Sequence, residues 1–244
     1  ADLVLELPTP WATSSAESFA RGGVGILAAA GVVDTLSFGS EGGDTAPLYR
    51  AAACLGSEEY RTALRRFLDK GLPFAACRQA AVEELLGREA ALCLSRPNDN
   101  LAVEYLRALP ERMGALAVRR VGAEHDGAPV GGYASASAIR GWLHCGKIQR
   151  AEAYLPEPWQ GDVASMEWCE RAVLSRLRTM CPEEAERLPD SGEGVAARLI
   201  SAGRAARSLE ELYALAKTKR YAHARIRRLA LWAYLGLAAE DRPE

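Results

Sequence analysis

A short serine-rich segment, YASASAIR (residues 133–140), has the residue types and spacing of an anion site. Ser135 and Ser137 lie where a helix is expected to begin, directly after a pair of glycines. Serine hydroxyls and free backbone N–H groups at a helix N-terminus bind anions, and Arg140, one turn later, adds a fixed positive charge. Alone, the segment is weak evidence for phosphate binding, because a serine ahead of a helix is commonly its N-cap.

Three other residues follow runs that are expected to be strands or extended chain. Gly39 lies in the turn FGSEGGD, Asn98 follows the apolar run at 92–95, and Arg120 ends a strand. Ligands of α/β sheets bind beyond the carboxyl ends of the strands. Glycine allows close backbone approach, an amide can recognise a ribose or base edge, and arginine neutralises phosphate. Each residue has a plainer interpretation, as turn glycine, helix N-cap or solvated charge, but together they predict a nucleotide site.

The elements that must position these residues alternate along the first part of the chain. Alternating side chains predict strands at about 3–7, 32–38 and 116–121. Helical spacing of apolar residues predicts helices at about 14–30, 46–55, 57–70, 74–86, 98–109 and 135–144. This order favours an α/β domain with a mostly parallel sheet over residues 1–150.

The second part of the chain is predicted to be helical. A linker-like stretch with Pro156, Pro158 and Gly161 precedes it, and no strand pattern follows. Helices are expected at about 164–180, 193–205, 208–218 and 222–238. Residues 151–244 are therefore predicted to form a separate helical domain.

Positive charge concentrates in this second domain. Residues 198–228 hold nine Lys and Arg side chains, against two carboxylates, Glu210 and Glu211. Cations with an interleaved aromatic suit an RNA backbone with an occasional stacked base, although such runs are often only a solvated helix face. RNA contact is predicted at Lys217, Lys219, Arg220, Arg225 and Arg228.

Composition excludes several other classes. The 244 residues carry a formal net charge of -2 and six cysteines, none of them in a C-x-x-C pair, so a zinc site is not expected. Scattered cysteines indicate reduced thiols of a cytoplasmic protein. The longest apolar run is too short for a membrane span. The sequence has no P-loop and no Ser-His-Asp order, so covalent catalysis by a side chain is not expected.

Several strings, taken in order, resemble those of the tRNA(Met) cytidine acetate ligase family. They are DLVLELPTPWATSSAESFARGGVGIL, FGSEGGD, RPNDNLAVEYLRAL, VRRVGAEHD, YASASAIR, GEGVAARLI and SLEELYALAKTKRYAHARIRRLAL. The resemblance covers almost the whole chain. It implies a nucleotidyltransferase-like α/β domain of the Rossmann-like HUP type, followed by a helical domain.

The resemblance also implies an activity. Family members use ATP to activate acetate as acetyl-adenylate, and then acetylate the exocyclic amine of the wobble cytidine in elongator tRNA(Met). Gly39, Asn98 and Arg120 match family contacts to ATP, and SASAIR resembles the helix start that binds triphosphate in nucleotidyltransferases. ATP, with Mg²⁺ left open, is therefore expected at Gly39, Asn98, Arg120, Ser135, Ser137 and Arg140.

One departure from the family pattern limits these expectations. Members open with a strand and an H-x-G-H motif, which holds the phosphates through positioned donors. None of the three histidines here, His125, His144 and His223, lies in such a motif. The chain is therefore expected to be a fragment that starts after the motif and stops before the family's end. No catalytic residue and no metal ligand are assigned.

Two other functions remain open at this point. The α/β half by itself also fits a small-molecule nucleotidyltransferase, which would not need a basic helical half. A non-catalytic RNA-binding module, with vestigial nucleotide loops, would fit the basic helices. The oligomeric state is not predicted.

Overall fold

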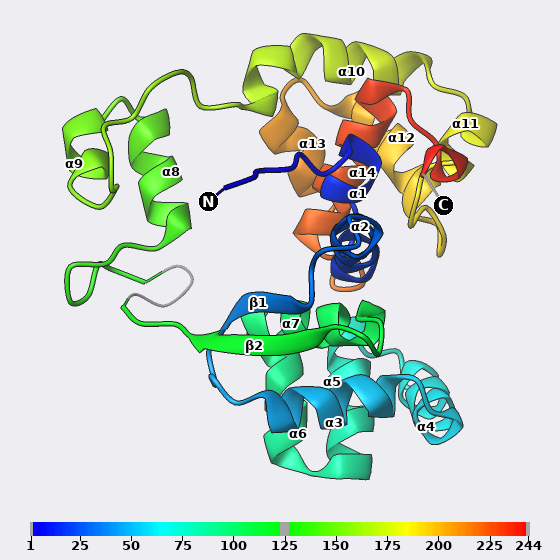
Figure 1. Cartoon of the computed structure of the whole chain (residues 1–244). Coiled ribbons are helices and arrows are strands. Elements are labelled where there is room, and N and C mark those ends of the chain that lie inside the picture. Colours follow the sequence, from blue (N-terminus) through cyan, green and yellow to red (C-terminus); the bar gives the residue numbers. More distant parts are fainter. Residues whose placement is uncertain (1, 123–126, 243–244) are drawn as a thin grey trace.

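The computed structural model describes residues 2–122 and 127–242, and most of these residues are helical (Figure 1). The first elements are α1 (Thr9–Ala12), α2 (Ala16–Ala29), β1 (Thr35–Ser40), α3 (Thr45–Leu55), α4 (Glu58–Leu68), α5 (Phe74–Leu86), α6 (Arg88–Ser95), α7 (Pro97–Ala108) and β2 (Gly114–Arg119). They are followed by α8 (Ala136–His144), α9 (Ile148–Glu152), η1 (Met166–Cys169), α10 (Glu170–Thr179), α11 (Pro182–Glu186), α12 (Val195–Ala205), α13 (Leu209–Ala216), α14 (His223–Leu235) and η2 (Ala239–Asp241).

The sheet formed by the described residues has two parallel strands, β1 and β2. Their register pairs Gly39 with Val118. On β1, Leu36, Phe38 and Ser40 are buried, while Thr35, Ser37 and Gly39 are exposed. Because the strands are parallel, their carboxyl ends meet at one edge of the sheet. This edge carries both Gly39 and Arg120.

Helices cover one side of the sheet and enclose the first hydrophobic core. Figure 1 shows α3 and α7 beside the strands, with α4, α5 and α6 farther away. Buried residues of this core include Val24 on α2, Leu48 on α3, Val82 on α5 and Val103 on α7. Sequence patterns set the helix ends locally. For example, the Ser57 hydroxyl caps α4 by accepting a hydrogen bond from the Tyr60 N–H at 3.1 Å.

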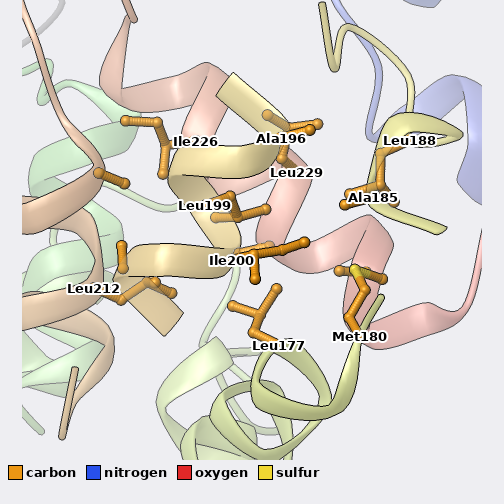
Figure 2. Packing of buried hydrophobic residues seen from close by; sticks show 14 of the residues in the cluster. Leu177, Met180, Ala185, Leu188, Ala196, Leu199, Ile200, Leu212, Ile226 and Leu229 are labelled. Carbon is orange, nitrogen blue, oxygen red and sulfur yellow. The ribbon is translucent and has the colours of Figure 1, made fainter. Parts of the chain in front are cut away.

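A second hydrophobic core lies among the helices that follow residue 165. Figure 2 shows Leu177 of α10, Leu199 of α12, Leu212 of α13 and Leu229 of α14 converging on one another. Trp232 of α14 is fully buried in the same cluster. The described residues beyond 150 contain no strand, as the sequence predicted.

Two polar contacts join the second core to the N-terminal helices. The Trp232 indole N–H donates to the carbonyl of Thr13 at 3.3 Å, and an Arg242 guanidinium N–H donates to the Ser18 hydroxyl at 2.9 Å. Both acceptors lie at the α1–α2 corner, which Figure 1 shows beside α14. The beginning and the end of the described chain are therefore held together here.

Helices α8 and α9 belong to neither core. Figure 1 shows them to one side of both, after the segment that follows β2. Aromatic contacts hold the pair together. The ring centroids of Trp142 and Tyr154 are 5.5 Å apart, and the Arg150 guanidinium lies 4.5 Å from the Trp142 ring centroid.

Two sequence-based predictions of extended chain are wrong. Residues 3–7 have no regular structure, and Leu3 and Leu5 are exposed. Alternating leucines favour a strand, but no neighbouring strand among the described residues supplies the hydrogen bonds that a strand needs. The run at 92–95 is the last turn of α6; so short an apolar run does not by itself distinguish a helix from a strand.

Each of the six cysteines carries a free thiol. Among the helices of the described residues, none is long and apolar enough to cross a membrane.

Close packing between α10 and α12 yields the first testable prediction. A Cβ added at Gly203 would lie 2.7 Å from the Leu177 Cβ, whereas one added at Gly25 of α2 would meet no atom within 4 Å. Alanine normally stabilises a helix by up to about 1 kcal/mol relative to glycine. Gly203→Ala should instead lower the free energy of unfolding by about 1–3 kcal/mol, through overpacking.

Urea denaturation of the two alanine variants checks this prediction. Gly25→Ala is the matched control and should leave stability unchanged or slightly raised. Equal stability of Gly203→Ala and the parent chain would contradict the packing described for α10 and α12.

Candidate functional site

The turn after β1 holds the start of α7 through a carboxylate. Glu41 Oε1 accepts hydrogen bonds from the Asn98 backbone N–H at 3.1 Å and from Asn98 Nδ2 at 2.7 Å. Glu41 Oε2 accepts a third from the Asp99 N–H at 2.8 Å. The first N–H groups of a helix have no partner within the helix. Glu41 therefore caps α7 from a distant part of the chain.

Asp99 makes the reciprocal contact with the turn. Its Oδ1 accepts hydrogen bonds from the Ser40 hydroxyl at 2.5 Å and from the Glu41 N–H at 2.9 Å. Ser40 and Asp99 are buried, so these bonds compensate for the loss of water around the carboxylate. The Arg96 guanidinium lies 3.5 Å from the other carboxylate oxygen, Asp99 Oδ2. We call Ser40, Glu41, Asn98 and Asp99 the carboxylate clasp.

The clasp changes the acidity of Glu41. Partial burial raises the pKa of this carboxyl group, but the hydrogen bonds from the Asn98 side chain and from the Asn98 and Asp99 N–H groups lower it more. The net effect is a pKa below the ordinary value of 4.5. The clasp therefore favours the charged form of Glu41.

A pocket of about 450 Å³ lies beside the clasp. Gly39 and Asn98 are among its lining residues, and most of the others are apolar or aromatic: Leu5, Leu7, Phe19, Val24, Leu27, Leu36, Phe38, Leu101 and Tyr105. This volume and lining are typical of a site for a small organic ligand. We call it the strand-end pocket.

Arg120 lies next to Gly39 at the strand ends. Its backbone N–H donates to the Ser40 carbonyl at 2.9 Å, which extends the β1–β2 pairing by one residue. A Cβ on Gly39 would lie 3.6 Å from the Arg120 Cγ, so the arginine stem passes over the glycine. The structure thus brings together Gly39, Asn98 and Arg120, three of the residues predicted for ATP.

The serine-rich segment lies elsewhere. Ser135 is the N-cap of α8, and its hydroxyl accepts a hydrogen bond from the Ala138 N–H at 3.1 Å. Ser137 is half-buried and Arg140 is exposed, on the first and second turns of the same helix. None of the three lines the strand-end pocket. Their role in phosphate binding stays a prediction.

Arg140 instead lines a larger groove of about 1060 Å³. One wall is α8, and the other walls come from the α1 end, the stretch around η1, and α13 and α14. The charged and aromatic side chains along it are Arg140, His144, Glu167, Glu170, Glu210, Tyr213, Lys217, His223, Arg227 and Arg228. We call it the interhelical groove. His125 lies outside the described residues.

The residues predicted for RNA contact have different surroundings. Lys217 and Lys219 are exposed, and Lys217 lines the groove. Arg228 also lines it; burial lowers the pKa of its guanidinium, while Asp190, 3.9 Å away, raises it. Arg220 lies 3.7 Å from Glu193 Oε1. The RNA-binding roles themselves stay predictions.

Arg225 holds a loop of the protein itself. It donates hydrogen bonds to the Asp190 carbonyl at 2.9 and 2.7 Å, to the Gly192 carbonyl at 3.2 Å, and to Glu193 Oε2 at 2.9 Å. Asp190 and Glu193 have φ angles of 57° and 64°, which are unusual for residues other than glycine. These contacts give Arg225 a structural role in stabilising the loop.

Sequence reasoning missed the role of the carboxylates that organise the clasp. Glu41 was not singled out, and Asn98 was considered as the N-cap of α7. In the structure the N-cap position is Arg96, and Glu41 supplies the capping oxygens. The available signal was a carboxylate close to two of the predicted site residues: Glu41 lies two residues after Gly39, and Asp99 directly follows Asn98. Within the described residues, no group of three or more His, Cys, Asp or Glu side chains could hold a metal ion.

Comparison with known proteins decides the family. The family model described as HIGH Nucleotidyl Transferase matches residues 1–244. The chain belongs to the HIGH nucleotidyl transferase family. Solved structures of the Thermotoga maritima protein TmcAL share its fold, at 30% identity over 98% of this chain and about 60% of theirs. The TM-scores are 0.90 for the apo form and 0.87 for the form bound with alpha-thio ATP, which confirms the predicted nucleotidyltransferase-like fold.

Several curated relatives of this HIGH nucleotidyl transferase share a name. A protein called tRNA(Met) cytidine acetate ligase from Thermoanaerobacter sp. (strain X514) is 34% identical over 255 residues, which is 97% of this chain and 63% of the relative. Another of the same name, from Syntrophomonas wolfei, is 33% identical over 256 residues, or 97% and 62%. The chain thus spans just over 60% of the length of these relatives.

The clasp makes the stability of this HIGH nucleotidyl transferase depend on pH. Since the folded-state pKa of Glu41 is below its unfolded-state value, Glu41 stabilises the fold fully above about pH 4.5. That contribution is lost as the pH falls through the lowered folded-state pKa. Glu41→Gln should reduce the free energy of unfolding at pH 7 by about 1 kcal/mol, the typical value of a lost cap. It should also make the free energy of unfolding depend less on pH in the acid range.

Unfolding free energies measured between pH 7 and pH 3 check the prediction about Glu41. Glu111→Gln removes an exposed carboxylate outside the clasp and serves as the matched control. If Glu41→Gln and the parent chain lose stability in parallel on acidification, the clasp does not have the proposed electrostatic effect.

Proposed function

We propose that this chain forms part of an ATP-dependent tRNA(Met) cytidine acetate ligase, which makes N4-acetylcytidine at the wobble position of elongator tRNA(Met). The names of its relatives support this proposal, as does the bound alpha-thio ATP of its structural neighbour. The observation that carries it is the meeting of Gly39, Asn98 and Arg120 at the strand ends, beside a pocket of suitable size.

The strand-end pocket suits an adenosine. Phe38 and Tyr105 offer apolar surface for a purine ring, and Gly39 leaves room at the strand end. Asn98 donates its amide N–H to Glu41, which leaves its amide oxygen available to accept a hydrogen bond from a base or ribose. Arg120 adds positive charge beside the same edge. We assign these residues to ATP, with Mg²⁺ as an accompanying ion.

The remaining assignments follow the order of the chain. Ser135, Ser137 and Arg140 at the start of α8 would bind phosphate, and the basic surface of α13 and α14 would bind tRNA. We propose that residues 1–150 form the nucleotide-binding domain and residues 151–244 the RNA-binding domain. We also propose that the protein acts in the cytoplasm, where such a reaction on tRNA would take place.

The proposed reaction requires positioning and charge stabilisation more than a nucleophilic side chain. An acetate oxygen would displace pyrophosphate from the α-phosphorus of ATP, and the cytidine amine would then take the acetyl group with release of AMP. Arg120 would stabilise charge that develops on the phosphates. Asn98, fixed by Glu41, would hold the nucleoside in one orientation.

Incorporation of labelled acetate tests the proposal. The full-length gene product would be incubated with labelled acetate, ATP and unmodified elongator tRNA(Met), and the tRNA would be digested to nucleosides. Label in N4-acetylcytidine is expected only when ATP is present. Absence of label in the tRNA would refute the ligase, and adenylyl transfer to a small molecule instead would favour a different nucleotidyltransferase.

Filling the strand end should weaken ATP binding without unfolding the protein. Gly39→Val places a β-branched side chain on an exposed strand position that lines the pocket, so strand formation is tolerated. We expect ATP affinity to fall roughly tenfold or more, the effect of losing about 1.4 kcal/mol of contact. Isothermal titration calorimetry measures the change.

Gly114→Val is the matched control for the strand end. It makes the same change on β2, at a residue that does not line the pocket, and its Cβ would have ordinary contacts at 3.8 Å. Equal ATP affinities of the two variants would contradict the proposal that ATP binds in the strand-end pocket.

A further inference from the structure

The interhelical groove has a basic end. Lys217 directly follows the last residue of α13, Arg227 and Arg228 lie on α14, and Arg140 lies on the α8 wall. Arg228 has Asp190 as a partner, whereas Lys217 and Arg227 form no ion pair within the described residues. Lys217 and Arg227 are therefore available in the groove for an external anion.

An aromatic side chain lies beside these cations. The Arg227 guanidinium lies 5.7 Å from the centroid of the Tyr213 ring, and the His223 ring meets Tyr213 edge-on at 5.4 Å. Tyr213 is half-buried, with its hydroxyl 3.8 Å from Met166 Sδ, so its ring is held in place. An aromatic ring with neighbouring cations is the usual platform for a nucleobase of a single strand.

The other end of the groove is acidic. Glu167 lies 3.6 Å from His144, Glu170 accepts a hydrogen bond from the Leu209 N–H at 2.8 Å, and Glu210 lies in the first turn of α13. Glu210 and Lys217 are seven residues apart, or about 10 Å along a helix. A polyanion is thus attracted to one end and repelled from the other, which suits a short unpaired strand better than a duplex.

We propose that the basic end of the interhelical groove binds an unpaired segment of the RNA substrate. Lys217 and Arg227 would contact phosphate, and Tyr213 would stack on a base. This proposal rests on the proposed function, which supplies an RNA with an unpaired anticodon loop. It also makes the proposed function more specific, because it adds Tyr213 and Arg227 as RNA contacts. Of the two lysines, Lys217 lines the groove and Lys219 does not.

Fluorescence anisotropy with a labelled stem-loop RNA, carrying the anticodon-loop sequence of elongator tRNA(Met), tests the groove. Lys217→Ala should weaken binding by the 244-residue chain roughly fivefold and reduce the salt slope by roughly 0.7, the value for one phosphate contact to a single strand. Tyr213→Leu should weaken binding roughly 5- to 100-fold, as expected for one lost stacking contact. Tyr213→Phe, which keeps the ring, should bind as the parent chain does.

The matched control is Lys147→Ala, which removes an exposed lysine that does not line the groove. Its binding should equal that of the parent chain, and so should its salt slope. A fully paired RNA of the same length should bind more weakly than the stem-loop. Thermal melting of every variant identifies any loss that comes from unfolding.

Three results would refute the proposal that the interhelical groove binds RNA. They are equal losses for Lys217→Ala and Lys147→Ala, unchanged binding by both Lys217→Ala and Tyr213→Leu, and no RNA binding by the parent chain. The acetate experiment separates this failure from failure of the proposed function. Acetylation that is unaffected by Lys217→Ala would reject the groove alone, whereas groove-dependent RNA binding without acetylation would reject the ligase alone.

Discussion

The site depends on one constraint: two carboxylates cap each other's chain segments across the edge of the sheet. Glu41, in the turn after β1, supplies acceptors for the start of α7, and Asp99, in α7, supplies acceptors for that turn. The Glu41 N–H of the turn and the Asn98 and Asp99 N–H groups of the helix find their acceptors across this contact, so the contact orders the turn and the helix together. Asn98 is oriented by the same contacts, and Gly39 and Arg120 lie on the strand ends that the turn continues.

The sequence predicts which residues lie at the strand ends better than it predicts the contacts that hold those residues in place. Gly39 and Arg120 follow from the rule that strand ends face ligands, because both strands lie within about three residues of their predicted positions. Asn98 was predicted from an extended run at 92–95 that is helical in the structure. Glu41 and Asp99 did not follow, since their pairing joins residues 58 positions apart, and side-chain periodicity carries no information over that distance. Likewise the leucines at 3–7 alternate as a strand does, but pairing depends on a neighbour that the local pattern cannot supply.

Charge counted along the chain differs from charge counted in space. Residues 198–228 contain nine cations, yet Arg225 serves the loop around Asp190, and Arg220 and Arg228 have carboxylates from that loop nearby. The loop precedes the basic stretch in sequence, so counting within the stretch overstates its free charge. Lys217 retains an unpaired charge among the described residues and lines the groove, which gives it more weight than its neighbours.

The two separate hydrophobic cores have a consequence for how the protein forms. The first core draws on residues 24–113 and the second on residues 173–233, so each is assembled from one continuous stretch of chain. Contacts between residues close in sequence form with a small loss of loop entropy, and such units can form one after the other during synthesis. The bond from Trp232 to Thr13 spans 219 positions and can form only when the last helix has emerged. The α1–α2 corner is therefore the last part of the first half to reach its final surroundings.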